Sequence, residues 1–212
     1  MRGEIEFMPR SPEQNREIRE KRIQQILDAT LCVYRERGYH GTEMGAIARQ
    51  AGLGRGLIYY YFKDKQDVFL TLIRQTLELW KVEVDPLLNS DRPVAEKLAE
   101  YLRMICYASL EYPDIYHLHQ SITRDIKVLF PEREKEVYGY YENNMFQPLR
   151  NQFLIAAESG EIGLCPEVAE RFFFSVLFEA VSQDYPRARD SVEEMVKAAL
   201  YGLVGSKKGK PE

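Results

Sequence analysis

The sequence predicts an all-α fold in which a small helix-turn-helix domain precedes a larger helical domain. Three observations indicate this. Apolar residues recur at helical spacing along most of the 212 residues, no long Val, Ile or Thr alternation marks a strand, and residues 42–65 place two short helical patterns around a glycine-rich turn. We expect residues 1–65 to form the first domain, with residues 1–10 disordered. Residues 66–206 then form the second domain and residues 207–212 a frayed tail.

The first long helix has clear start and stop signals. Ser11 is a good N-cap, Pro12 suits the first helical position, and Gln14 can complete a capping box. Gly38 follows the last helical residue, where glycine readily takes the left-handed conformation. Four basic residues lie on the first half: Arg16, Arg19, Lys21 and Arg22. On an isolated helix such a face is usually only solvated, but beside a helix-turn-helix we expect one or more of them to contact phosphate.

The stretch TEMGAIARQAGLGRGLIYYYFKDK, residues 42–65, predicts the helix-turn-helix itself. Thr42 is the expected N-cap of a short support helix, and Gly52 fits the left-handed position after its end. Gly54 can cap the second helix, which begins at about Arg55. In such a motif the second helix is the recognition helix, whose N-terminal residues can enter a major groove.

This stretch resembles the TetR family of bacterial repressors over about the first third of the chain. Ten residues stand at positions that match the family pattern: Thr42, Ile47, Ala48, Ala51, Gly52, Gly56, Tyr59, Tyr61, Phe62 and Lys65. Gly54 departs from the family's usual capping serine, and Leu57 stands where a small hydroxyl residue is common. The resemblance implies a cytoplasmic homodimeric transcriptional repressor that binds double-stranded DNA and a small effector.

Arg55 is the best candidate for reading a base, since a guanidinium can bind guanine O6 and N7 together. The expected DNA-binding residues are Thr42, Arg55, Gly56, Leu57, Tyr59, Tyr60, Lys63 and Lys65. Gly56 permits close backbone approach, whereas Leu57 offers a thymine methyl only apolar contact. We expect Tyr59 and Tyr60 to point outward and Phe62 inward, and the side on which Tyr61 lies stays open.

Charge is unevenly distributed along the chain. The net charge is −4, but residues 9–65 contain 11 Lys and Arg against 7 Asp and Glu, whereas residues 66–212 contain 17 against 24. The basic charge therefore lies with the helix-turn-helix, as a phosphate-binding face requires. The acidic remainder would repel DNA and so help to orient the molecule.

The rest of the chain reads as a series of helices. Asp64 is the expected cap of the next helix, and Ser191 of the last. The expected helices cover residues 65–86, 94–112, 114–127, 131–159, 167–185 and 191–204, with a break at 89–93.

The second domain is rich in Tyr, Phe and Met. For any single residue, a place in the core is the simpler interpretation, but collectively these side chains suit an apolar pocket between helices. The resemblance implies a small lipophilic effector there, either fatty-acyl-coenzyme-A-like or drug-like. The expected pocket residues are Trp80, Tyr101, Met104, Tyr107, Tyr116, His117, Gln120, Arg124, Tyr138, Tyr141, Met145 and Glu179, with His117, Gln120, Arg124 and Glu179 as the polar members.

The last two predicted helices are too apolar to face water on every side. We expect them to pair with their copies as a four-helix bundle, which would give a C2 dimer with two recognition helices for a pseudo-palindromic operator. The expected interface residues are Phe173, Val176, Leu177, Val181, Val196, Leu200 and Leu203.

The sequence contains no catalytic constellation, so we expect no enzyme, cofactor or metal site. His117 and His119 are two residues apart and fall on different faces of a helix. Three scattered cysteines suggest a reducing compartment, and no run of about 18 apolar residues predicts a membrane span. The alternatives are a small-molecule-binding protein without operator recognition, an all-α enzyme and a redox sensor.

Overall fold

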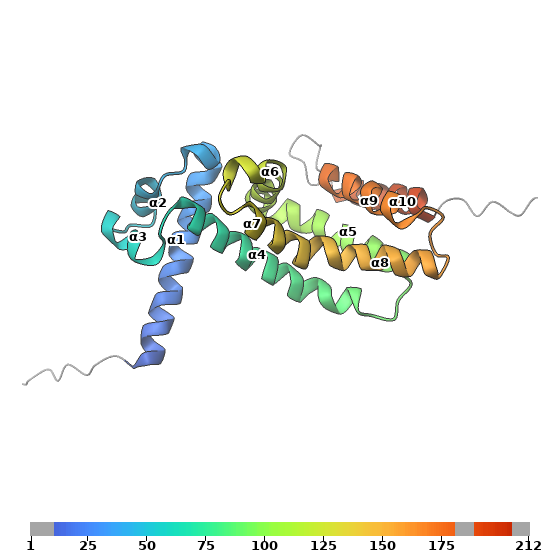
Figure 1. The fold of residues 1–212 in the computed structure, drawn as a ribbon, viewed down its shortest axis with the longest axis horizontal. Coiled ribbons are helices and arrows are strands. Elements are labelled where there is room, and N and C mark those ends of the chain that lie inside the picture. Colours follow the sequence, from blue (N-terminus) through green and yellow to red (C-terminus); the bar gives the residue numbers. More distant parts are fainter. Residues whose placement is uncertain (1–10, 181–188, 205–212) are drawn as a thin grey trace, which may run out of the picture. The chain divides into compact units, whose positions relative to one another are not determined.

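The computed structural model describes residues 11–180 and 189–204, and every regular element in those ranges is helical (Figure 1). The all-α prediction is therefore confirmed. The elements are α1 (Pro12–Gly41), α2 (Met44–Gln50), α3 (Arg55–Tyr61), α4 (Lys65–Leu88), α5 (Val94–Glu111), α6 (Pro113–Leu129), α7 (Glu134–Tyr141), the π-helical segment η1 (Glu142–Phe146), α8 (Gln147–Glu158), α9 (Pro166–Ala180) and α10 (Arg189–Val204).

The chain divides into two compact units, Met1–Leu72 and Ile73–Glu212. We call them the N-terminal unit and the helical unit. The division falls beyond residue 65 because the first turns of α4 belong to the N-terminal core: Phe69 is fully buried, with its ring 5.9 Å from that of Tyr34. The predictions for residues 1–10 and 207–212 lie outside the described residues.

Helix α1 begins as expected. The Ser11 hydroxyl accepts a hydrogen bond from the Gln14 amide (3.2 Å), and the Gln14 side chain accepts one from the Ser11 amide (3.0 Å). Gly38 interrupts the helix with a φ of 64°, and the chain then makes one more turn to Gly41. The predicted stop at Gly38 thus marks a kink before the last turn.

The predicted capping role of Thr42 is wrong. Glu43 occupies the N-cap position of α2, and no side-chain hydrogen bond caps that helix. Thr42 is fully buried and its hydroxyl donates to the Gly38 carbonyl (2.7 Å). Thr42 therefore satisfies a carbonyl at the end of α1, where the left-handed Gly38 leaves acceptors without helical partners.

The turn between α2 and α3 follows the prediction. Gly52 has a φ of 65° and Gly54 is the N-cap of α3. The turn orients both helices over a small apolar core in which Ile26, Ile47 and Ile58 are fully buried. This packing fixes the recognition helix to α1 and α2.

In the helical unit, α5 packs against α6, α8, α9 and α10, and α8 lies along α9. The core includes a chain of aromatic rings: Tyr101 lies 6.2 Å from Phe173, which lies 5.6 Å from Phe153. Buried aromatic side chains dominate such a core because each removes a large area from water.

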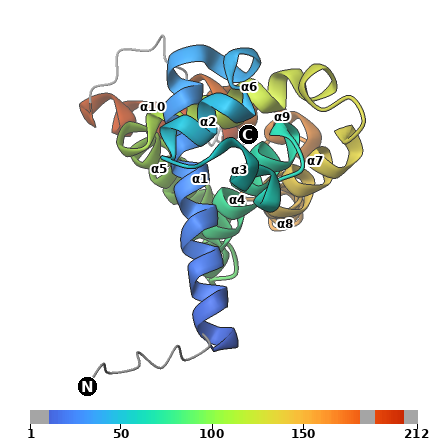
Figure 2. The same ribbon diagram turned by 90° about the vertical axis from the view of Figure 1, so that its left-hand side faces the viewer.

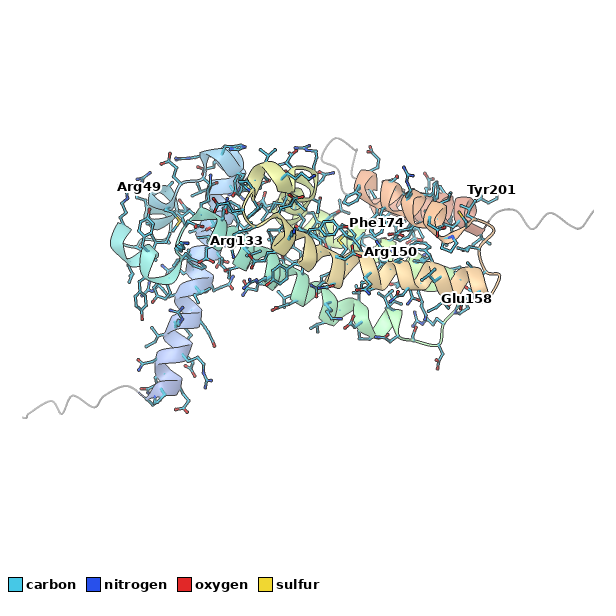
Figure 3. The ribbon with its side chains drawn as sticks, in the orientation of Figure 1. Arg49, Arg133, Arg150, Glu158, Phe174 and Tyr201 are labelled. Carbon is cyan, nitrogen blue, oxygen red and sulfur yellow. The ribbon has the colours of Figure 1, made fainter. Side chains whose placement is uncertain are left out.

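The single helix expected over residues 131–159 is largely confirmed. The structure has a continuous helical run from Glu134 to Glu158, in which the π-helical segment η1 joins α7 to α8 and Pro148 lies in the first turn of α8. Proline cannot donate a helical hydrogen bond and its ring clashes with the preceding turn, and a π-helical segment relieves both problems. Arg150, which is labelled in Figure 3, pairs with Glu142 of η1 (2.6 Å) and with Glu170 of α9 (3.1 Å).

The last helix begins at Arg189, so the predicted cap Ser191 lies inside it. Residues 181–188, which include the expected end of the preceding helix, are outside the described ranges. Over residues 11–180 and 189–204, no helix combines the length and apolar character needed to cross a membrane.

Candidate DNA-binding surface and effector-binding interior

The N-terminal unit brings two arginines together beside Gly45. A Cβ atom on Gly45 would lie 3.7 Å from Nε of Arg55 and 3.8 Å from Nη1 of Arg49. Arg55 begins α3 and Arg49 lies in the last turn of α2, where Figure 3 labels it. The glycine leaves the two cations without a side chain between them, so they form one positive patch at the start of the recognition helix. Arg49 was not among the predicted residues, although it follows Gly45 at i+4 on the same helix face.

The outer face of α3 is exposed as expected. Tyr59 and Tyr60 are exposed, with Tyr60 at 72%, whereas Phe62 is buried. The orientations predicted for these three residues are confirmed. Tyr61, whose side had stayed open, is half-buried, with its ring edge-on to Tyr60 at 5.0 Å. Leu57 is also exposed, which places an apolar side chain on this face.

Gly56 is exposed, and a Cβ atom there would meet no other atom within 4 Å. Its φ also lies outside the left-handed region, because Gly38, Gly52 and Gly160 are the glycines with positive φ among the described residues. Neither backbone conformation nor internal packing requires a glycine at this position. The backbone at Gly56 is therefore open to close approach by an external partner.

The two predicted lysines differ. Lys63 is exposed, whereas Lys65 is half-buried and its ammonium donates to the Tyr39 carbonyl (3.0 Å) while lying 4.4 Å from the Tyr39 ring centroid. Burial lowers the pKa of Lys65 and raises that of Tyr39 to about 12. Lys65 therefore holds the end of α1. Asp64 caps α4 as predicted, since its carboxylate accepts from the Asp67 amide (2.8 Å).

A buried histidine connects three helices of the helical unit. His119 of α6 contacts the Thr76 hydroxyl of α4 through Nε2 (2.7 Å) and the Tyr141 hydroxyl of α7 through Nδ1 (2.7 Å). Thr76 donates its hydroxyl hydrogen to the Ile73 carbonyl (3.1 Å), so its oxygen accepts from Nε2–H of His119. Nδ1 then accepts from Tyr141, and the chain of hydrogen bonds is complete without a ligand.

His119 is the polar residue that the sequence reasoning missed. Burial lowers its pKa to about 4, so the imidazole is neutral near pH 7. The expected His117 lies two residues away on α6. The two histidines had been considered only as a metal pair, and the hydrogen-bonding partners of His119 come from distant segments that carry no local signal.

The other predicted pocket residues separate into two groups. Exposed residues on the surface of the helical unit are Tyr107, Arg124, Tyr138 and Glu179. Buried or half-buried residues are Trp80, Tyr101, Met104, Tyr116, His117, Gln120, Tyr141 and Met145. Within the second group, Trp80 Nε1 donates to the Tyr101 hydroxyl (3.1 Å), and Gln120 donates to the Phe178 carbonyl (3.3 Å). The polar atoms in this interior are therefore largely bonded to one another.

Residues 26–72 match the family model described as "Bacterial regulatory proteins, tetR family". Over these residues the chain is similar to TetR-family regulators. The match covers α2, α3 and the segments of α1 and α4 that pack on them, which is the part of the molecule that carries the Arg49–Arg55 patch.

Several curated relatives of the chain are regulators. It is 28% identical over 142 residues to the HTH-type transcriptional regulator RutR of Escherichia coli (strain K12), which is 61% of this chain and 66% of that protein, just under two thirds of its length. It is 36% identical over 75 residues to the fatty acid metabolism regulator protein of Bacillus subtilis (strain 168), covering 35% of this chain and 39% of that protein.

Two solved structures share the fold over most of both chains. The transcriptional regulator FadR from Bacillus subtilis in complex with stearoyl-CoA has a TM-score of 0.71 at 24% identity, covering 85% of this chain and 98% of that one. AibR in complex with isovaleryl coenzyme A and operator DNA has a TM-score of 0.72 at 18% identity, covering 86% and 98%. At these identities the similarity establishes the fold.

The residues expected at the dimer interface are mostly internal. Phe173, Leu177, Val196 and Leu203 are each 1% exposed and belong to the protomer core, so the interface role predicted for them is wrong. Their apolar character follows from packing within the protomer, chiefly on α5. Val176 and Leu200 are half-buried, and Val181 lies outside the described residues. Exposed apolar side chains on α8, α9 and α10 are Leu154, Ile155, Val168, Phe172 and Tyr201.

Proposed function

We propose that this chain is a homodimeric DNA-binding transcriptional repressor that a small lipophilic effector releases from a pseudo-palindromic operator. The observation that carries the proposal is the pair of guanidinium groups from Arg49 and Arg55 beside Gly45. Two cations from adjacent helices at the start of α3 suit one base contact and one phosphate contact. The exposed Tyr59, Tyr60 and Lys63 extend this surface with hydroxyl and ammonium donors.

We place the effector in the interior of the helical unit. His119 and Tyr116 are half-buried in this interior, where burial lowers the pKa of His119 and raises that of Tyr116. The polar groups there are largely paired already, which favours a ligand recognised by apolar contact.

An acyl-coenzyme A is the effector class that we propose. The solved FadR and AibR relatives hold stearoyl-CoA and isovaleryl coenzyme A, and a curated relative is a fatty acid metabolism regulator. The aromatic rings of Tyr141, Phe146 and Phe174 follow one another at 6.2 Å and 5.2 Å between α7 and α9, and would suit an acyl chain.

Release would follow from differential affinity. An effector that binds one conformation of the helical unit more tightly shifts the dimer toward it, and the spacing of the two recognition helices then no longer fits successive major-groove turns. This function requires no bond making or breaking by the chain. A repressor of this kind acts on the chromosome, so we place it in the cytoplasm.

We propose that the exposed apolar side chains of α8, α9 and α10 form the dimer interface in place of the core residues named from the sequence. Phe172 and Tyr201 belong to neighbouring helices, and the Phe172 ring lies against Gly202, where a Cβ atom would approach within 2.6 Å. An apolar surface that crosses several helices suits isologous pairing around a two-fold axis.

Selection of random duplexes on the purified protein, followed by sequencing, tests the proposal. We expect an enriched palindrome-like site. Adding acyl-coenzyme A esters of increasing chain length should then weaken binding to that site, with free coenzyme A as the control. If folded, dimeric protein enriches no site either with or without these esters, the chain is instead a small-molecule-binding protein of this fold, a possibility that the exposed Leu57 of the recognition helix supports.

A further inference from the structure

The first three turns of α1 are uncovered by the rest of the N-terminal unit. Every residue from 12 to 21 is exposed, and burial in this helix begins at Ile26 (Figure 2). A helix that buries no apolar surface is marginal by itself, yet this one carries a complete capping box at its start. We call residues 12–22 the arm. The capping box stabilises a helical segment that contributes no buried side chain to the core of the N-terminal unit.

Arg19 lies at the centre of the basic side of the arm. At about 100° per residue, Arg16 and Arg22 project about 60° to either side of Arg19, and the buried Ile26 and Thr30 project within about 20° of it. Glu13 and Glu20 lie beyond Arg16, at about 100–120° from Arg19, and Glu17 lies on the opposite side at about 160°. The arginines therefore flank the side of α1 that packs against the rest of the unit.

Arg19 connects this basic face to the recognition helix. Its guanidinium lies 5.9 Å from the ring centroid of Tyr60 and 5.4 Å from that of Tyr61. Both distances are within the range of a cation–π contact. Tyr60 is among the most exposed apolar side chains of the described residues, so the contact places Arg19 at the edge of the proposed DNA surface.

We propose that the arm binds DNA phosphates beside the half-site that α3 reads, through Arg16, Arg19 and Arg22. This rests on the proposed DNA-binding function and extends its contact surface. The arginines meet the main requirement of phosphate binding, a row of cations on one face that is continuous with the reading helix. The three arginines span about 9 Å along the helix, so the arm adds contacts over about three base pairs.

The salt dependence of operator binding tests whether the arm binds DNA phosphates. Each of the two arms in a dimer loses one phosphate contact in Arg19→Gln, so the slope of log K against log salt should become shallower by about 1.8. Between about 50 mM and 200 mM salt, the variant should therefore lose roughly tenfold less affinity than the parent protein. Glutamine retains helix propensity and part of the side chain, which keeps the arm helical.

Lys21→Gln is the matched control. It removes the same charge two residues away, but Lys21 lies about 160° from Arg19 and lines a hollow with Gln50 and Ala51 on another side of α1. Its slope should equal that of the parent. Arg19→Lys should restore the parental slope, because a phosphate contact needs the charge and not the guanidinium plane.

If the parent binds its site normally but Arg19→Gln and Lys21→Gln give equal slopes of log K against log salt, the arm does not bind phosphate. The proposed DNA-binding function would then remain intact. If the parent protein shows no saturable binding to any selected duplex, the proposed function itself fails. Phosphate-ethylation interference on the operator gives an independent readout: modified phosphates beside the α3 half-site should block both proteins, whereas those that the arm contacts should block the parent but not the Arg16→Gln/Arg19→Gln/Arg22→Gln variant.

Discussion

The two units use polar side chains in opposite ways. In the N-terminal unit, Arg49, Arg55 and Tyr60 are exposed on one surface around an apolar core. In the helical unit, His119 and Tyr101 lie inside and already hold hydrogen-bond partners from other helices. The difference teaches that the N-terminal unit presents its polar side chains to an external partner, whereas the helical unit uses them to link its own helices.

The largest expected effect tests the dependence of the helical unit on internal packing. Phe173→Ala should lower the free energy of unfolding by about 3–5 kcal/mol, because the ring is 1% exposed and contacts the rings of Tyr101 and Phe153. The matched change on the proposed DNA surface is Tyr60→Ala, at a side chain that is 72% exposed, and it should alter stability by less than about 0.5 kcal/mol. Denaturant unfolding measures both, and similar losses would remove the contrast between the units.

The next effect tests charge presentation. Arg55→Ala should weaken operator binding by about 1–3 kcal/mol, roughly 5- to 150-fold in Kd, because a bidentate base contact is lost while the fold stays unchanged. Arg92→Ala removes the same charge from an exposed position of the helical unit and should leave Kd unchanged. Fluorescence anisotropy on the selected operator measures both variants. Equal losses would show that only total charge matters.

A third effect tests the buried histidine by pH. The pKa of His119 is lowered in the folded state to about 4, so the folded protein binds fewer protons than the unfolded chain between about pH 4 and the ordinary pKa near 6.5. The contribution of His119 to the free energy of unfolding is therefore fully present above about pH 6.5 and decreases as the pH falls toward 4. The expected loss between about pH 7 and pH 5 is about 2 kcal/mol.

His119→Gln should remove this part of the pH dependence, and His117→Gln, two residues away, should retain it. Thermal or denaturant unfolding at both pH values provides the measurement. A pH profile in His119→Gln that matches the parent would show that His119 is not the group responsible.

The smallest effect compares two helix caps. Asp64→Ala should lower global stability by about 1 kcal/mol, because the carboxylate caps α4, whose first turns bury Val68 and Phe69. Ser11→Ala removes a cap from the uncovered arm and should reduce only local helicity. Hydrogen exchange separates the two outcomes: protection should fall in residues 12–22 for Ser11→Ala and through the N-terminal core for Asp64→Ala.

Most of the correct predictions depend on residues that are close together in the sequence. The capping box at Ser11, the left-handed Gly52 and the break at residues 89–93 each depend on a few neighbouring residues, and the structure confirms all three. The wrong predictions concern features set by distant segments. Thr42 bonds to the end of the helix before it, and the continuous helix around Pro148 contains a π-helical segment in which Glu142 pairs with Arg150.

The sequence by itself determined the helical class, the position of the helix-turn-helix and the concentration of basic charge around it, since periodicity, turn chemistry and charge are properties of short stretches. Only the tertiary structure decided which apolar side chains are core and which are surface, so that Phe173 is internal and its neighbour Phe172 is exposed. It also decided that His119, and not His117, joins α4 to α7, and that Arg49 and Arg55 meet beside Gly45. Burial and pairing depend on segments far apart in the chain, and a periodic pattern cannot say which helix covers which face.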